Sequence, residues 1–143
     1  MTNKKEIIAG IIIIGNEILS GRTKDLNTSS ISIWLNSLGI KVKEVRVIPD
    51  VEETIISTVN GLRKKFDYIF TTGGIGPTHD DITASSLSKA FNLTYGPHKE
   101  AFKILESYYK TDEFNEGRQR MAWMPTEAKL ILNPTSGAPG FYV

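Results

Sequence analysis

The sequence predicts an α/β sandwich with a mainly parallel sheet. Apolar, β-branched runs alternate along the chain with segments in which apolar residues recur at helical spacing. The first run, Ile7–Ile14, is apolar along almost its whole length, which is typical of a strand covered on both faces. A glycine-rich loop separates another apolar run from a helical pattern, as expected where a parallel strand passes into its crossover helix.

The first half of the chain supplies three strands and two helices. After Ile7–Ile14, the spacing of apolar residues predicts a helix over 27–38, and Gly39 follows as its stop. Alternation predicts a second strand over 41–48. Asp50 then resembles the N-cap of a second helix, with a glutamate three residues later.

The second half begins with the third strand, Tyr68–Thr72, and the glycine loop. The elements expected beyond this loop are a helix ending near Asn92, a helix whose first turn holds Pro97, a helix over 115–124, and strands over 129–132 and 141–143.

Composition restricts the class of protein. A chain of 143 residues with 40% apolar and 23% charged residues is expected to form one soluble domain, residues 1–143. A formal net charge of +1 gives no electrostatic reason to expect nucleic-acid or membrane partners. The absence of cysteine excludes disulfides and thiolate chemistry and fits the cytoplasm, and two histidines exclude a multi-histidine zinc site.

The loop after the third strand is the strongest functional signal. Gly73, Gly74 and Gly76 allow backbone N–H groups to approach a ligand, and the following helix start adds free donors, so the place suits phosphate. The adjacent Asp80 and Asp81 indicate either a magnesium ion or a ligand rich in hydroxyls or amines. The alternative is an ordinary turn in which Asp80 or Asp81 caps the helix, but the density of glycines and carboxylates favours a ligand site.

Two other loops follow strand ends and carry similar residues. One contains Gly15, Asn16 and Glu17, and the other runs from Asn133 to Gly140. Because ligands gather outside the carboxyl ends of parallel strands, we expect these loops to form one pocket with the glycine loop. For Glu17 the alternative is a capping or solvent-facing carboxylate, and for Asn133 it is simple turn chemistry.

These three motifs resemble the molybdopterin-binding domain of molybdenum-cofactor biosynthesis proteins, and more closely the amino-terminal domain of competence/damage-inducible CinA proteins and their stand-alone relatives. The motifs are residues 15–21 with Asp25 and Asn27, residues 72–83, and residues 133–141. The resemblance implies a three-layer α/β/α sandwich with a mainly parallel sheet. It also implies a pocket for molybdopterin or a nucleotide-like phosphate compound. Some relatives adenylylate molybdopterin with magnesium, and CinA-type proteins are linked to hydrolysis of ADP-ribose pyrophosphate.

The chain departs from the family pattern in two places. Asn16 stands where many relatives carry an aspartate. Relatives also continue beyond Phe141 with another strand, a loop and a helix, so we expect the domain to lack them and to cover the exposed apolar surface by homo-oligomerisation. These departures leave two classes open: a magnesium-dependent nucleotide pyrophosphatase or adenylyltransferase, and a non-catalytic binding domain.

The resemblance assigns roles to named residues. Glu17, Asp80 and Asp81 are the expected metal ligands and catalytic carboxylates. The expected ligand-binding residues are Gly15, Asn16, Thr72, Gly73, Gly74, Gly76, Pro77, Thr78, Thr83, Asn133, Pro134, Ser136 and Gly137. Arg118 and Arg120 are candidates to balance phosphate charge, although a solvated helix face is the favoured interpretation for both. The scheme requires no histidine base, so His79 has no assigned role.

Overall fold

The computed structural model describes residues 3–143, which divide into two compact units. The first unit ends at Gly73 and the second runs from Gly74 to Val143. The first unit contains one sheet, the second contains two small ones, and each unit has its own helices. Within the described residues, no helix is long and apolar enough to cross a membrane.

The first unit is built around a three-stranded parallel sheet. Its strands are β1 (Ile7–Ile14), β2 (Ile40–Ile48) and β3 (Tyr68–Thr72), in the order β2-β1-β3. All three predicted strands are therefore confirmed. The central strand β1 is buried at every residue from Ala9 onward, on both faces, which explains why its sequence is apolar without alternation.

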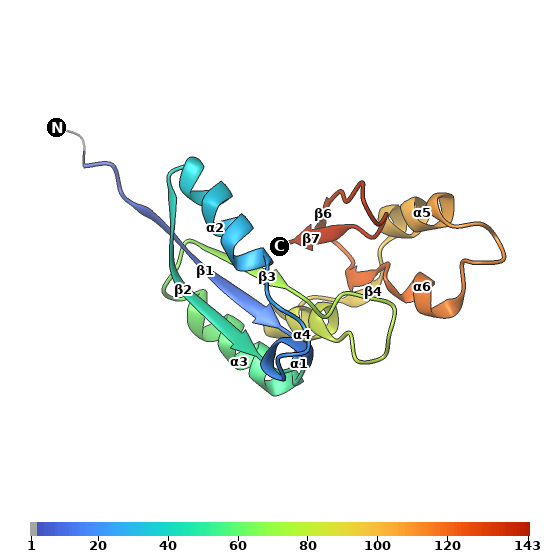
Figure 1. The fold of residues 1–143 in the computed structure, drawn as a ribbon. Coiled ribbons are helices and arrows are strands. Elements are labelled where there is room, and N and C mark those ends of the chain that lie inside the picture. Colours follow the sequence, from blue (N-terminus) through green and yellow to red (C-terminus); the bar gives the residue numbers. More distant parts are fainter. Residues whose placement is uncertain (1–2) are drawn as a thin grey trace. The chain divides into compact units, whose positions relative to one another are not determined.

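Helices cover this sheet on both sides. They are α1 (Asn16–Leu19), α2 (Asn27–Ser37) and α3 (Glu52–Leu62). The chain moves from β1 to β2 in one direction and from β2 to β3 in the other, so right-handed crossovers place α2 and α3 on opposite faces, as Figure 1 shows. Leu35 of α2 is fully buried, whereas Trp34, which contributed to the predicted helical pattern, is 57% exposed.

The predicted cap of α3 is wrong. The N-cap residue is Val51 and no side chain caps this helix. The carboxylate of Asp50 instead accepts a hydrogen bond from the backbone N–H of Asn16 at 3.0 Å. Local spacing predicts that the Asp50 side chain caps the helix. The side chain instead bonds to a loop that is distant in sequence.

The second unit contains small elements around its own core. Its helices are α4 (Thr83–Ala90), α5 (Lys99–Tyr108) and α6 (Glu116–Arg120), and its strands are β4 (Tyr95–Pro97), β5 (Trp123–Pro125), β6 (Lys129–Ile131) and β7 (Gly140–Tyr142). β4 pairs with β5, and β6 with β7, both antiparallel. Ala101, Leu105, Ala122 and Met124 form the buried core of this unit.

Two predictions in this unit are wrong at their boundaries. The helix predicted over 115–124 ends at Arg120, because Trp123–Pro125 forms a strand with β4. Pro97 ends strand β4, and the N-cap of α5 is His98. The buried His98 ring uses both nitrogens, since Nδ1 accepts from the Ala101 N–H at 3.3 Å and Nε2 lies 2.9 Å from the Ala128 carbonyl oxygen.

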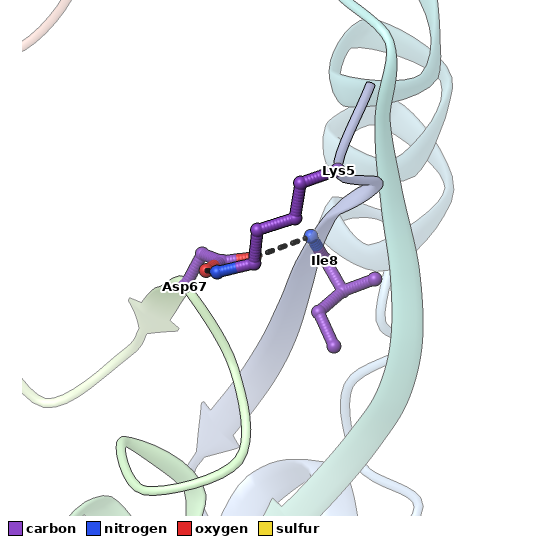
Figure 2. Close-up of polar contacts among 3 residues, drawn as sticks. All are labelled: Lys5, Ile8 and Asp67. Carbon is purple, nitrogen blue, oxygen red and sulfur yellow. Dashed lines mark hydrogen bonds and ion pairs between the residues drawn. The ribbon is translucent and has the colours of Figure 1, made fainter. Parts of the chain in front are cut away.

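A polar contact holds the amino-terminal end of the central sheet together (Figure 2). The Asp67 carboxylate accepts from the Ile8 N–H at 3.0 Å and from Lys5 Nζ at 3.1 Å, and the Asp67 N–H donates to the Ile8 carbonyl at 2.9 Å. The bond from Ile8, followed by that from Lys5, holds the pKa of Asp67 below its ordinary value of 3.8. The residue just before β3 is thus fastened to the start of β1.

This contact predicts a specific acid sensitivity. A carboxyl whose pKa is lowered in the folded state stabilises the protein fully above its ordinary pKa of 3.8. That contribution is lost as the pH falls through the folded-state pKa. Asp67→Asn should therefore lower the free energy of unfolding at pH 7, and the gap to the wild type should shrink below about pH 4.

Urea denaturation at several pH values measures this gap. Lys5→Ala is the matched control, because it keeps the bond from Ile8, which is the largest single cause of the lowered pKa. It should retain most of the pH dependence. A gap between Asp67→Asn and the wild type that stays constant from pH 7 to pH 3 would contradict the account.

Candidate anion site in the glycine loop

The loop after β3 takes a conformation that only glycine adopts easily. Gly73 and Gly74 have φ values of 90° and 68°, in the left-handed region. A Cβ on Gly73 would lie 2.0 Å from the Ile14 carbonyl oxygen, and one on Gly74 would lie 2.1 Å from Thr83 Oγ1. The two glycines therefore let the chain leave β3 beside the end of β1 and then pass directly against the start of α4.

Asp81 closes the loop from inside. Its Oδ2 accepts from the Thr78 N–H at 2.9 Å and from the Thr78 hydroxyl at 2.7 Å, and its own N–H donates to the Thr78 carbonyl at 3.1 Å. Gly76 makes this possible, since a Cβ there would lie 2.8 Å from the same Oδ2. The Thr83 N–H donates to the Gly74 carbonyl at 3.1 Å and completes the closure.

Neither aspartate caps α4. The N-cap residue is Ile82 and no side chain caps the helix. The alternative in which Asp80 or Asp81 caps the helix in an ordinary turn is therefore wrong. Among residues 3–143, the sole ion-pair partner of Asp80 is His79, at 3.3 Å, and both side chains are largely exposed. The acidic pair is thus divided: Asp81 orders the loop, while Asp80 faces solvent.

Three consecutive backbone donors remain unused in this closed loop. Within residues 3–143, the N–H groups of Gly74, Ile75 and Gly76 donate to no group. The neighbouring Thr78 N–H is occupied by Asp81. A run of unpaired N–H groups in a turn is the feature that binds anions in many proteins.

These residues line a narrow pocket that lies wholly in the second unit. Its walls are Gly74, Ile75, Gly76, Thr78, Asp81, Ala84, Tyr95, Arg120, Met121, Trp123, Met124, Pro139 and Phe141. The cavity volume is about 30 Å³, which is room for about two waters. Only a small group therefore fits inside without movement of the walls, and the remainder of a larger ligand would lie outside.

The structure distinguishes the two candidate arginines. Arg118 donates from its guanidinium to the Glu113 carbonyl at 2.7 Å and lies over the Tyr109 ring at 4.4 Å from the centroid. Arg120 lines the pocket, and its side chain has no hydrogen-bond or ion-pair partner among the described residues. Arg120 is therefore interpreted as a positive charge at the pocket, and not as part of a solvated helix face.

Four of the residues expected from the sequence meet in this pocket: Gly74, Gly76, Thr78 and Asp81. Pro77 belongs to the same loop and its carbonyl lies close to Gly117 of α6, while Thr83 is the first residue of α4. Tyr95 and Trp123 were not among the expected site residues, because Trp123 lies within the helix predicted over 115–124 and Tyr95 lies between two predicted helices. No local pattern marks this strand, since Trp123, Met124 and Pro125 are all apolar and do not alternate with polar residues.

The segment after β1 lies in the first unit and binds to itself and to the loop after β2. Asn16 Oδ1 accepts from the Asp50 N–H at 3.3 Å, while Asp50 Oδ2 accepts from the Asn16 N–H at 3.0 Å. Glu17 folds back toward Gly15, where a Cβ would lie 2.6 Å from Oε1. Asn16 therefore has a structural role that joins the ends of β1 and β2.

The segment from Asn133 to Gly137 is also bonded internally. Asn133 Oδ1 accepts from the N–H of Thr135 at 3.1 Å and of Ser136 at 3.4 Å, and Asn133 Nδ2 donates to Ser136 Oγ at 2.7 Å. Gly137 has a φ of 73° and packs against the Tyr108 ring. These residues and Pro134 do not line the pocket, whose wall is formed by Pro139 and Phe141.

The predicted metal site stays a prediction. Across residues 3–143, no group of three or more histidine, aspartate or glutamate side chains is arranged to hold an ion. Glu17 belongs to the first unit, and Asp80 and Asp81 belong to the second. Among the oxygens of the acidic pair, Asp81 Oδ1 makes no hydrogen bond within the described chain, since both bonds from Thr78 go to Oδ2.

The division of the acidic pair predicts unequal effects on stability. Asp81→Ala removes the acceptor of two hydrogen bonds, so the free energy of unfolding should fall by about 1–2 kcal/mol. Asp80→Ala is the matched control and should change it by less than about 0.5 kcal/mol, because that side chain is exposed. Chemical denaturation of both variants tests this. Equal losses would show that Asp81 does not hold the loop.

Comparison with known proteins places the fold and the family. A family profile described as a probable molybdopterin binding domain matches residues 10–143. A protein of Caldivirga maquilingensis is 41% identical over 138 residues, covering 94% of this chain and 53% of the relative. One from Saccharolobus islandicus is 39% identical, with 94% and 52% covered. The chain therefore spans about half the length of the curated relatives it matches.

Solved structures agree with this result. The CinA protein of Thermoplasma acidophilum, described as having unknown function, matches with a TM-score of 0.86 and 30% identity over 94% of this chain and 79% of that one. The molybdopterin biosynthesis enzyme MoaB of Thermus thermophilus matches with a TM-score of 0.56 and 18% identity, over 78% and 69% of the two chains, which shows the fold alone. The fold and the family profile agree: the chain belongs to the family of probable molybdopterin binding domains.

Proposed function

We propose that this chain binds a molybdopterin- or nucleotide-like phosphate compound through the glycine loop. The observation that carries the proposal is the run of unused N–H groups at Gly74, Ile75 and Gly76, in a pocket that also contains the unpaired Arg120. Backbone donors and a guanidinium are the groups that proteins use to hold phosphate oxygens. The family description supports the pterin-like part of the ligand.

The loop is prepared for this task before the ligand arrives. Asp81 and Thr78 hold the turn, and the contact between Gly74 and Thr83 fixes its other side. Three donors that are already oriented lose little conformational freedom on binding, which favours affinity. The cavity volume of about 30 Å³ matches one small anionic group rather than a whole ligand.

A second candidate is catalysis on a phosphoanhydride, as in ADP-ribose hydrolysis or adenylyl transfer. Asp80 favours it, because it precedes the pocket residue Asp81 and its exposed carboxylate has His79 as its sole ion-pair partner among the described residues. Asp80 and Asp81 Oδ1, which makes no hydrogen bond among the described residues, would hold magnesium together with water. Magnesium, when bound, would neutralise charge on the phosphates. The alternative is that the chain binds its ligand without catalysing a reaction, as a non-catalytic binding domain.

We also propose a cytoplasmic protein that self-associates. The lack of cysteine fits a reducing compartment. Exposed apolar side chains on α2, among them Ile33 at 69% and Trp34 at 57%, support self-association.

The two arginines provide a direct test of anion binding. Arg120→Gln should weaken the binding of ADP-ribose by roughly tenfold or more, because a charge-assisted hydrogen bond is worth about 1.5–3 kcal/mol. Arg118→Gln is the matched control on the same helix, and it should leave affinity nearly unchanged, since Arg118 is bonded to Glu113 and Tyr109. Isothermal titration calorimetry measures both. Equal effects, or an effect of Arg118→Gln alone, would contradict the assignment.

Release of AMP separates the catalytic from the non-catalytic candidate. The protein is incubated with ADP-ribose, FAD or ATP, with and without magnesium, and AMP is measured by chromatography. Catalysis predicts AMP that depends on magnesium and falls at least tenfold in Asp80→Asn. Binding without AMP release would support the binding domain and reject the enzyme.

A further inference from the structure

We infer that Tyr95 and Trp123 form a stacking subsite for a planar heterocycle at the glycine-loop pocket. The subsite would hold the ring of the phosphate compound proposed above. This inference rests on the proposed function, because it assumes that the phosphate lies against Gly74–Gly76. It adds the part of the ligand that the loop does not select.

The β4–β5 ribbon presents the two rings on one side. Tyr95 pairs with Pro125 and Trp123 pairs with Pro97, so Tyr95 and Trp123 are diagonal neighbours on the same face. Between them, Met124 points to the other face and is buried in the core of the second unit. The ring centroids lie 5.5 Å apart with a tilt of 56°. The ribbon thus has a core face and an aromatic face.

The aromatic face belongs to the same pocket as the free donors. Tyr95 and Trp123 both line it together with the glycine loop and Arg120, yet each remains 39% exposed. Arg120 lines the same pocket. Burial raises the pKa of the Tyr95 phenol, and the positive charge of Arg120 acts in the opposite direction. Aromatic surface is thus available where a phosphate would bind.

The size of the pocket determines where a heterocycle would lie. A cavity volume of about 30 Å³ accepts a phosphate-sized group but no bicyclic ring. A ring attached to that phosphate must therefore lie outside the cavity, against its exposed walls. Trp123 and Tyr95 are the aromatic members of those walls apart from Phe141, and bases stack on such side chains regardless of their hydrogen-bonding pattern.

The chain offers a clean optical test. It contains two tryptophans, Trp34 and Trp123, and Trp34 lies on α2 of the first unit. Trp34→Phe therefore leaves Trp123 as the single reporter. In this variant, AMP should quench the fluorescence in a saturable way, while ribose 5-phosphate should bind in calorimetry without comparable quenching.

The affinities test the energetic claim. AMP should bind roughly tenfold more tightly than ribose 5-phosphate, within the range expected for one stacked base. Trp123→Ala should remove this difference, because it should weaken the binding of AMP much more than that of ribose 5-phosphate. Trp123→Phe should retain most of it, and circular dichroism verifies that both variants are folded.

The outcomes separate this inference from the proposed function. If AMP and ribose 5-phosphate bind equally, or if Trp123→Ala weakens both equally, the stacking subsite is rejected while phosphate binding stands. If neither compound binds the wild-type protein, the proposed function fails and the subsite fails with it. If AMP preference persists in Trp123→Ala, the ring binds elsewhere and the inference is overturned.

Discussion

Two glycines directly after β3, both in the left-handed backbone conformation, fix the conformation of the glycine loop. Gly73 has no room for a Cβ against the Ile14 carbonyl, and Gly74 has none against Thr83. With the chain turned in this way, carbonyl and side-chain acceptors are used within the loop while three N–H groups are left over. The donors are free because the backbone is fixed, and a more flexible turn would satisfy them with its own carbonyls.

The same loop shows how one local sequence divides structural and functional work. The Asp81 carboxylate accepts two hydrogen bonds from Thr78 and keeps the turn closed, whereas the Asp80 carboxylate is exposed to solvent. Arg118 donates a hydrogen bond to the Glu113 carbonyl and lies over the Tyr109 ring, whereas Arg120 lines the pocket without a hydrogen-bond or ion-pair partner among the described residues. In both pairs the residue types are equal and only their partners differ. Composition and spacing therefore identify such pairs but do not assign the roles within them.

The parallel sheet was predictable because its strands carry strong, local signals. Ile7–Ile14 is apolar on both faces and Tyr68–Thr72 ends at glycines, so each strand is specified by its own residues. The errors arose where distant residues decide the outcome. Asp50 was assigned to a helix cap but binds Asn16, and Trp123–Pro125 was assigned to a helix but pairs with Tyr95–Pro97. No local pattern contains those partners, so the aromatic face of the pocket could not be predicted.

The central claim is that the N–H groups of Gly74, Ile75 and Gly76 bind phosphate. Amide chemical shifts of ¹⁵N-labelled protein, titrated with inorganic phosphate and with potassium chloride at equal ionic strength, test it most directly. The account predicts saturable shifts at these three amides with phosphate alone, and little change at the Thr78 amide, which Asp81 already occupies. Shifts that are absent from residues 74–76, or that chloride reproduces, would contradict it.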